Sequence, residues 1–230
     1  GGNGGISPGS GNGGAGGDIS LSGDSIVISG NITAQGGASA SGSNGSAGLI
    51  TITNSSTGIS SSVGGVIAGL NFIKAGAGTL VLTGTNTFTG TTTISSGTLV
   101  FENNVPALSS SQYIGPGSLV IRPSSTSFSN TFLFNVSTLN LGSLTIGKDG
   151  NSADITFGSS INSSGPVTVY GKAVNVNQNI ATNAAGDILI KASGAVTIAT
   201  GKTITTSNGN ITITTSRFVN SSSSSALNAG

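Results

Sequence analysis

Acidic side chains are the first place to look for chemistry in this sequence, because the chain contains no His and no Cys. Without them, neither a Ser-His-Asp nor a Cys-His catalytic device can be built within the chain. We interpret the closest acidic pair, Asp149 and Asp154, as part of a solvated turn with the sequence KDGNSAD, and we predict no catalytic residue. The carboxylates are scattered along the chain, at Asp18, Asp24, Glu102, Asp149, Asp154 and Asp187.

Calcium binding is the second chemistry to consider. The segment GGAGGDISL at 13–21 approaches the glycine-rich nonapeptide of calcium-binding β-rolls, but Ser20 stands where that motif has an apolar residue, and no tandem copy follows. Residues 149–154 lack the acidic density of an EF-hand loop. We therefore predict no metal site, no cofactor and no enzymatic activity.

The low charge of the chain limits the kinds of partner that it can bind. Only 6% of residues are charged and the net charge is +1, so Ser, Thr, Asn and Gly must hydrate the surface. Phosphate binding needs clustered Lys and Arg, and we expect no nucleic-acid partner. No run of about 20 apolar residues is present, and we expect no membrane insertion of this segment.

Short alternating segments must carry whatever function the chain has. Apolar and polar residues alternate over four to six positions between Gly, Asn, Ser and Asp, as in LITIT at 49–53, TLVLT at 79–83 and DILIKA at 187–192. This pattern predicts β-strands, whereas the good helix formers are scarce and no apolar period of 3.6 residues is sustained.

The spacing between the apolar anchors of these segments indicates how the strands are arranged. Val167, Val174 and Ile180 are seven and six residues apart, and the equivalent first anchors Val167, Ile188 and Ile211 are 21 and 23 apart. GDI at 17–19 recurs at 186–188, and GNIT at 30–33 recurs at 209–212. Self-similarity at such a period is typical of repeat architectures.

We therefore predict an all-β, three-sided β-solenoid of about 22 residues per turn, with parallel strands stacked about 4.8 Å apart. About ten turns would make a rod on the order of 50 Å long. An all-β sandwich would also show short strands, but it would not predict the recurrent GDI and GNI openings. Sandwiches also usually bury a Trp or Cys, and both are absent.

Three regions depart from this pattern within the single solenoid predicted for 1–230. Residues 1–17 are interpreted as a glycine-rich lead-in or excursion, and 220–230 as a Ser-rich linker. Residues 103–136 contain three prolines and several aromatic residues, so we expect an irregular excursion there, because proline cannot donate to a central strand ladder. The chain begins at Gly1 without Met, which we interpret as a segment of a larger exported precursor.

Residues 76–101, GAGTLVLTGTNTFTGTTTISSGTLVF, carry a more specific signal. They resemble the autotransporter-associated β-strand repeat of bacterial passenger domains, with Phe88 in place of the more usual Tyr. The flanks are similar in texture to exported adhesins of the filamentous-haemagglutinin kind. The matching positions are Gly76, Gly78, Leu80, Leu82, Gly84, Asn86, Thr87, Phe88, Thr89, Gly90, Thr92, Ile94, Gly97 and Leu99.

This resemblance implies a right-handed parallel β-helix in a passenger that is secreted or held at the surface of a Gram-negative bacterium. In that family the repeat is thought to help the passenger fold during export. We expect Leu80, Leu82, Ile94, Leu99 and Phe101 to point inward, with Phe88 filling a corner.

The function predicted first is a structural or adhesin segment that presents a protease-resistant rod to host or neighbouring-cell surface components. The alternative is a subunit of an extracellular filament or sheath, assembled end to end or laterally from copies of itself. A third hypothesis is an ice- or glycan-binding module that uses Thr-x-Thr triplets at 51–53, 91–93, 203–205 and 212–214. Thr is also the natural outward partner of Ile in any strand.

Overall fold

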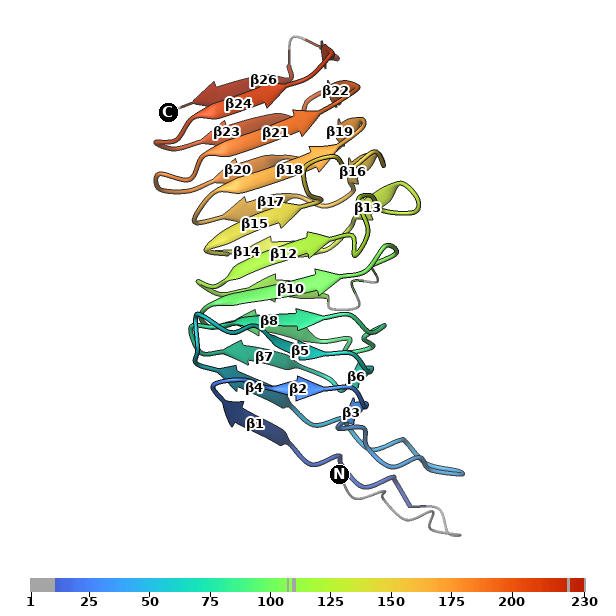
Figure 1. Ribbon diagram of the computed structural model, residues 1–230. Coiled ribbons are helices and arrows are strands. Elements are labelled where there is room, and N and C mark those ends of the chain that lie inside the picture. The colour runs from blue at the N-terminus through green and yellow to red at the C-terminus, as the bar shows by residue number, and fades with distance from the viewer. Residues whose placement is uncertain (1–10, 107, 109–110, 223, 230) are drawn as a thin grey trace.

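The computed structural model describes residues 11–106, 108, 111–222 and 224–229. All the regular secondary structure in these residues is β-strand. The strands form a coil whose successive turns stack along one axis, with the two termini at opposite ends (Figure 1). All strand pairs are parallel and join consecutive turns. The coil is right-handed, as expected for parallel crossovers (Figure 1).

Three faces make up each turn. The first face begins with a six-stranded sheet and continues into a four-stranded one, and a single bridge between Leu141 and Ser163 connects the two. Its strands are β1 (Ile19–Gly23), β4 (Ile50–Asn54), β7 (Phe72–Ala75), β9 (Thr91–Ile94), β11 (Gln112–Ile114) and β14 (Ser137–Leu139), then β17 (Ile161–Ser163), β20 (Ile180–Thr182), β23 (Thr203–Thr206) and β26 (Ala226–Ala229).

The second face is one continuous nine-stranded sheet, and the third consists of a two-stranded and a five-stranded sheet. The second face contains β2 (Val27–Ile28), β5 (Ser61–Val63), β8 (Thr79–Leu82), β10 (Thr98–Glu102), β12 (Ser118–Arg122), β15 (Ser143–Ile146), β18 (Val167–Gly171), β21 (Ile188–Ala192) and β24 (Ile211–Thr214). The third contains β3 (Ile32–Thr33), β6 (Ile67–Ala68), β13 (Phe132–Phe134), β16 (Ile155–Phe157), β19 (Val174–Val176), β22 (Ala195–Ile198) and β25 (Arg217–Asn220).

The register confirms the predicted solenoid and its repeat. Val167 pairs with Ile188, and Ile188 pairs with Ile211. The coil has about eight turns of about 22 residues, fewer than the ten expected. Part of the difference arises because glycine-rich backbone between β3 and β4 leaves the coil, so that Ile32 pairs with Ile67, 35 residues later. Residues 11–17, before β1, also lie outside the strand ladders.

Inward side chains form the core as ladders along the axis. Leu80, Leu99, Leu119, Leu144 and Val167 lie above one another in register and are fully buried. The inward positions predicted for the repeat at 76–101 are confirmed, since Leu80, Leu82, Phe88, Ile94, Leu99 and Phe101 are all buried.

An aromatic row packs within this core. The ring of Phe88 stacks on that of Phe72 with centroids 5.1 Å apart, and it lies 6.3 Å from the ring of Phe101. Phe101 in turn meets the ring of Tyr113 edge-on at 5.8 Å. Phe88 therefore links two turns within the core, while its place at a corner stays a prediction.

The glycine-rich backbone outside the coil packs against itself. The N–H of Gly13 donates to Ser43 O at 2.9 Å, and the N–H of Gly16 donates to Ser46 O at 2.8 Å. This three-residue spacing is that of polyproline II chains, in which glycine permits close backbone approach. A Cβ on Gly45 would lie 1.9 Å from Gly14 O. Residues 11–17 thus pack against 34–48, and the rest of the predicted lead-in, residues 1–10, lies outside the described residues.

Residues 103–136 differ from the predicted excursion, because β11, β12 and part of the third face fall within them. The prolines are accommodated outside the ladders: Pro116 lies between β11 and β12, and Pro123 directly follows β12. Only the loops around them leave the coil. The predicted linker at 220–230 likewise contains β26, which pairs with β23.

Candidate functional site

A repeated side-chain contact holds successive turns together at the corners of the coil. An Asp or Asn stands directly before the first inward residue of a strand, and its Oδ1 accepts the backbone N–H at the equivalent position one turn later. The donor and acceptor pairs are Leu49 and Asp18 at 2.8 Å, Val66 and Asn31 at 2.8 Å, Thr91 and Asn71 at 2.9 Å, Ala173 and Asp154 at 3.1 Å, Thr203 and Asn179 at 3.0 Å, and Asn210 and Asp187 at 2.7 Å.

These corner contacts give a physical reason for the recurrent GDI and GNI openings. The side-chain acceptor satisfies a backbone N–H where the strand ladder begins, much as an N-cap residue does for a helix. Asp18, Asp154 and Asp187 therefore have structural partners. Glu102 is paired with Arg122, 2.6 Å away on the next turn.

The two members of the candidate acidic pair, Asp149 and Asp154, bind different partners. Asp154 accepts the Ala173 N–H at a corner, whereas Asp149 forms an ion pair with Lys191. In the described part of the chain, no three residues of the types His, Cys, Asp and Glu gather into a possible metal site.

Two residues before the segment that carries the family resemblance lies a buried cation that the sequence analysis did not single out. Lys74, on β7, is fully buried, and its Nζ donates to the carbonyl oxygens of Ala75 at 3.0 Å, Gly76 at 2.6 Å and Ser96 at 3.0 Å. Burial lowers the pKa of Lys74 to about 8. The contact with Ser96 crosses to the next turn, so the ammonium ties two turns together.

Two glycines with positive φ values lie beside this ammonium. Gly76 and Gly97 have φ values of +78° and +67°, which an L side chain rarely adopts. A Cβ on Gly97 would also lie 2.7 Å from the Lys74 Nζ. The alternation in FIKA at 72–75 contained a signal for the buried lysine, because Phe72 and Lys74 must share one side of the strand.

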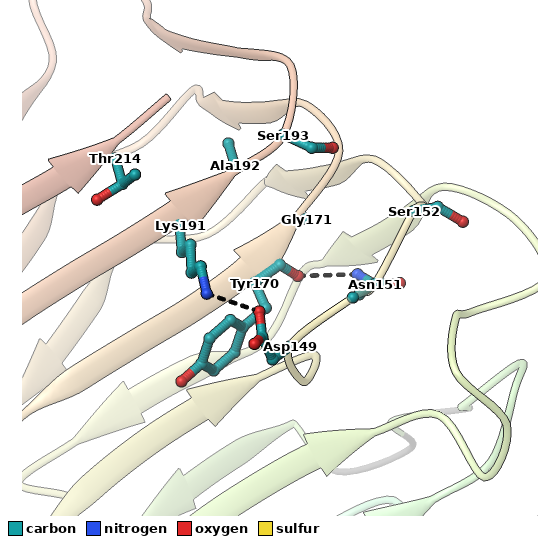
Figure 2. Close-up of a pocket in the computed structure, with 10 residues that line it drawn as sticks. Asp149, Asn151, Ser152, Tyr170, Gly171, Lys191, Ala192, Ser193 and Thr214 are labelled. Atoms are coloured by element: carbon teal, nitrogen blue, oxygen red, sulfur yellow. Dashed lines mark hydrogen bonds and ion pairs between the residues drawn. The ribbon is translucent and has the colours of Figure 1, made fainter. Parts of the chain in front are cut away.

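A groove lies at a corner between the second and third faces. We call it the corner groove; its volume is about 240 Å³. Figure 2 shows how the loop after β15 meets the ends of β18 and β21 there. Its lining residues are Asp149, Gly150, Asn151, Ser152, Tyr170, Gly171, Lys191, Ala192, Ser193 and Thr214.

The loop of the corner groove is fixed by Asn151, a buried polar residue. Its Nδ2 donates to Tyr170 O at 2.8 Å (Figure 2). Its Oδ1 accepts from Ser127 Oγ at 2.9 Å and from Phe128 N at 3.2 Å. Gly150 supplies a φ of +83°. Because these bonds tie the loop to neighbouring turns, the loop holds one shape.

Opposite charges meet at the mouth of the groove. Lys191 Nζ lies 2.8 Å from Asp149 Oδ1, with both side chains substantially exposed (Figure 2). The hydrogen bond with Lys191 lowers the pKa of Asp149, and the same bond raises the pKa of Lys191. Both groups are therefore charged at neutral pH and offset each other.

The fold and its corner contacts define a three-sided, right-handed parallel β-solenoid. The family model described as passenger-associated-transport-repeat matches residues 72–101, a stretch that contains the resemblance at 76–101. The match and the solenoid together support similarity to the β-helix of autotransporter passengers.

No curated protein and no solved structure matches the chain. The likeness of the flanks to filamentous-haemagglutinin-type adhesins therefore stays a prediction. No helix suited to crossing a membrane is found in the described residues.

Proposed function

We propose that this chain is a non-catalytic structural segment of an exported bacterial passenger, which holds a protease-resistant β-helical rod on the surface of a Gram-negative cell. The observation that carries the proposal is the transport repeat at 72–101, set within an uninterrupted stack of parallel turns. A coil with few charges and a continuous apolar core exposes little cleavable backbone, which suits a secreted rod.

The physical role of the repeat in this proposal is to template the stack. Its strands β8 and β10 pair directly over four residues, and the ring of Phe88, between β8 and β9, lies 6.3 Å from that of Phe101 on β10. A turn that folds locally gives the next turn a complete strand edge on which to pair. The rest of the rod then grows by adding turns.

A double substitution tests this role. Leu80→Asp with Leu82→Asp places two carboxylates in the core, and it should abolish proteinase-resistant material on intact cells that produce the protein. Thr79→Asp with Val81→Asp is the matched control, because these residues alternate with the leucines on the same strand and are only partly buried. Unchanged resistant yield from the core variant would contradict the role of the repeat.

Surface location needs a separate measurement. Antibodies raised against the folded chain should label intact, unpermeabilised cells. Labelling that requires permeabilisation would overturn the proposed location while leaving the solenoid untouched.

A second candidate function is assembly into an extracellular filament or sheath. Only 6% of the residues are charged and the net charge is +1, so little electrostatic repulsion opposes lateral or end-to-end packing of copies of this chain. Fibres of uniform width in electron microscopy would support assembly, whereas a monodisperse rod would favour the first function.

Ice or glycan binding by threonine ladders receives no support from the register. Thr51 pairs with Ile73, Ile73 with Thr93, and Thr93 with Ile114. The triplet at 212–214 lies on the second face, away from the others. Among the described strands, the triplets therefore do not stack into one continuous threonine surface.

A further inference from the structure

The corner groove is built by a loop that the coil itself does not require. Between β15 and β16 the chain uses residues 147–154 to turn from the second face to the third. One turn later the same corner is made by residues 172–173, and the turn after that by 193–194. The loop 147–154 is thus six residues longer than the same corner in the next two turns, and the corner one turn earlier, at 123–131, is also long; loops on a rigid scaffold commonly carry binding function.

The inserted loop is held in place by two glycine turns and by one buried polar side chain. Two of its glycines, Gly147 and Gly150, adopt positive φ values of +78° and +83°. Buried Asn151 joins the loop to Ser127, Phe128 and Tyr170 through its side chain. A groove wall fixed in this way is preorganised, so a ligand would not have to order it on binding.

The chemistry of the groove is amphipathic. The ring of Tyr170, together with Gly171 and Ala192, supplies apolar surface, and Figure 2 shows the paired Asp149 and Lys191 beside that ring. Because the carboxylate and the ammonium offset each other, the groove favours neither an anion nor a cation. It offers a hydrogen-bond acceptor and a donor next to an aromatic face.

We propose that the corner groove binds one ring of a neutral hexopyranose sugar, whose C–H face packs on Tyr170 while its hydroxyl groups bond to Asp149 and Lys191. A pyranose presents this combination of an apolar face and a hydroxyl rim. The volume of about 240 Å³ admits a single ring rather than an extended oligosaccharide. Ser193 and Thr214 line the same groove and supply further hydroxyl partners.

The tyrosine content of the chain gives a direct assay. The chain has two Tyr and no Trp, and Tyr113 is buried in the core. A Tyr113→Phe variant therefore leaves Tyr170 as the only tyrosine fluorophore. Titration of this variant with the methyl glycosides of glucose, galactose and mannose should change its fluorescence saturably for at least one of them, and saturation-transfer NMR should show contact with the same sugar.

Two groove variants make the test specific. Tyr170→Ala removes the stacking surface and should weaken binding by roughly tenfold, as measured by saturation-transfer NMR. Asp149→Asn keeps the size of the side chain but removes the charged acceptor, and it should also weaken binding. Lys202→Gln lies outside the groove and should bind as the parent does, and an unchanged thermal unfolding profile would confirm that each variant is folded.

Three results would overturn the proposal: no saturable binding of any of the three glycosides, binding unchanged in Tyr170→Ala, or tighter binding of glucuronate or inorganic phosphate than of the neutral sugars. The assay uses the isolated chain. A failure to bind sugar would therefore leave the proposed surface role standing. Failure of the surface-labelling experiment would likewise leave the sugar-binding proposal standing.

Discussion

Buried Lys74 leads to a prediction about how stability depends on pH. Its folded-state pKa of about 8 lies below its ordinary value of 10.5 because burial disfavours the ammonium. Between these two values the unfolded chain binds more protons at this position than the folded chain does. The free energy of unfolding should therefore rise with pH across this window, and below pH 8 the full destabilisation should remain.

The size of the effect follows from the gap between the two pKa values. A difference between about 8 and 10.5 corresponds to at most about 3 kcal/mol. The actual gain should be smaller, because three carbonyl oxygens bond to the Nζ and favour the charged form. We expect an increase of about 1 to 3 kcal/mol on going from pH 7.5 to pH 10.5.

Urea unfolding followed by far-ultraviolet circular dichroism measures this increase. Lys74→Met is the reference, since it keeps the length of the side chain and cannot titrate. Subtracting its pH dependence removes every contribution that the two proteins share. If the parent gains no stability relative to Lys74→Met between the two pH values, the buried, desolvated ammonium is refuted.

Two further predictions concern backbone contacts outside the repeat. Asp187→Ala removes the acceptor for the Asn210 N–H and should lower the free energy of unfolding by about 1 kcal/mol. Asp187→Asn keeps an acceptor oxygen and should retain most of this stability. Equal loss of stability in both variants would contradict the corner contact. Gly45→Ala places a Cβ 1.9 Å from Gly14 O and should increase hydrogen exchange at 11–17, while Gly17→Ala, with open space around it, should not. Unchanged exchange in Gly45→Ala would show that this packing is absent.

Much of the coil could be predicted because its determinants are local and periodic. The apolar anchors Val167, Ile188 and Ile211 stack as their spacing predicts, since a solenoid maps sequence period directly onto contact. The inward residues of the transport repeat followed from simple alternation along each strand. The recurrent GDI and GNI openings marked the period, but their hydrogen-bonding role needed the register.

Where the structure differs from the sequence-based expectation, the reason is contact between turns, which the pattern within one strand does not reveal. Pro116 and Pro123 suggested an irregular 103–136, yet strands of three to five residues fit between the prolines and pair in register. The packing of 11–17 on 34–48 depends on the close approach of glycine backbones. The composition of 1–17 alone suggested a loose lead-in or excursion.

The corner groove escaped the sequence analysis for a related reason. Its charged partners Asp149 and Lys191 are 42 residues apart, on different turns. The sequence placed Asp149 in a turn, and that turn does exist, but only the stacking brings Tyr170 and Lys191 beside it. The signal that the sequence did contain was the length of the loop 147–154 and not its residue types.

A spin-label distance series tests most directly whether the chain coils about one axis. The chain has no Cys, so labelled cysteine pairs can be placed on the register column that runs through Val81, Val120, Thr145, Thr168, Leu189 and Thr212, leaving out its buried member Val100. With about 4.8 Å per turn, backbone separations should be about 14 Å for Thr145 and Thr212 and about 29 Å for Val81 and Thr212. Distances that fail to increase in proportion to the number of turns would contradict the solenoid.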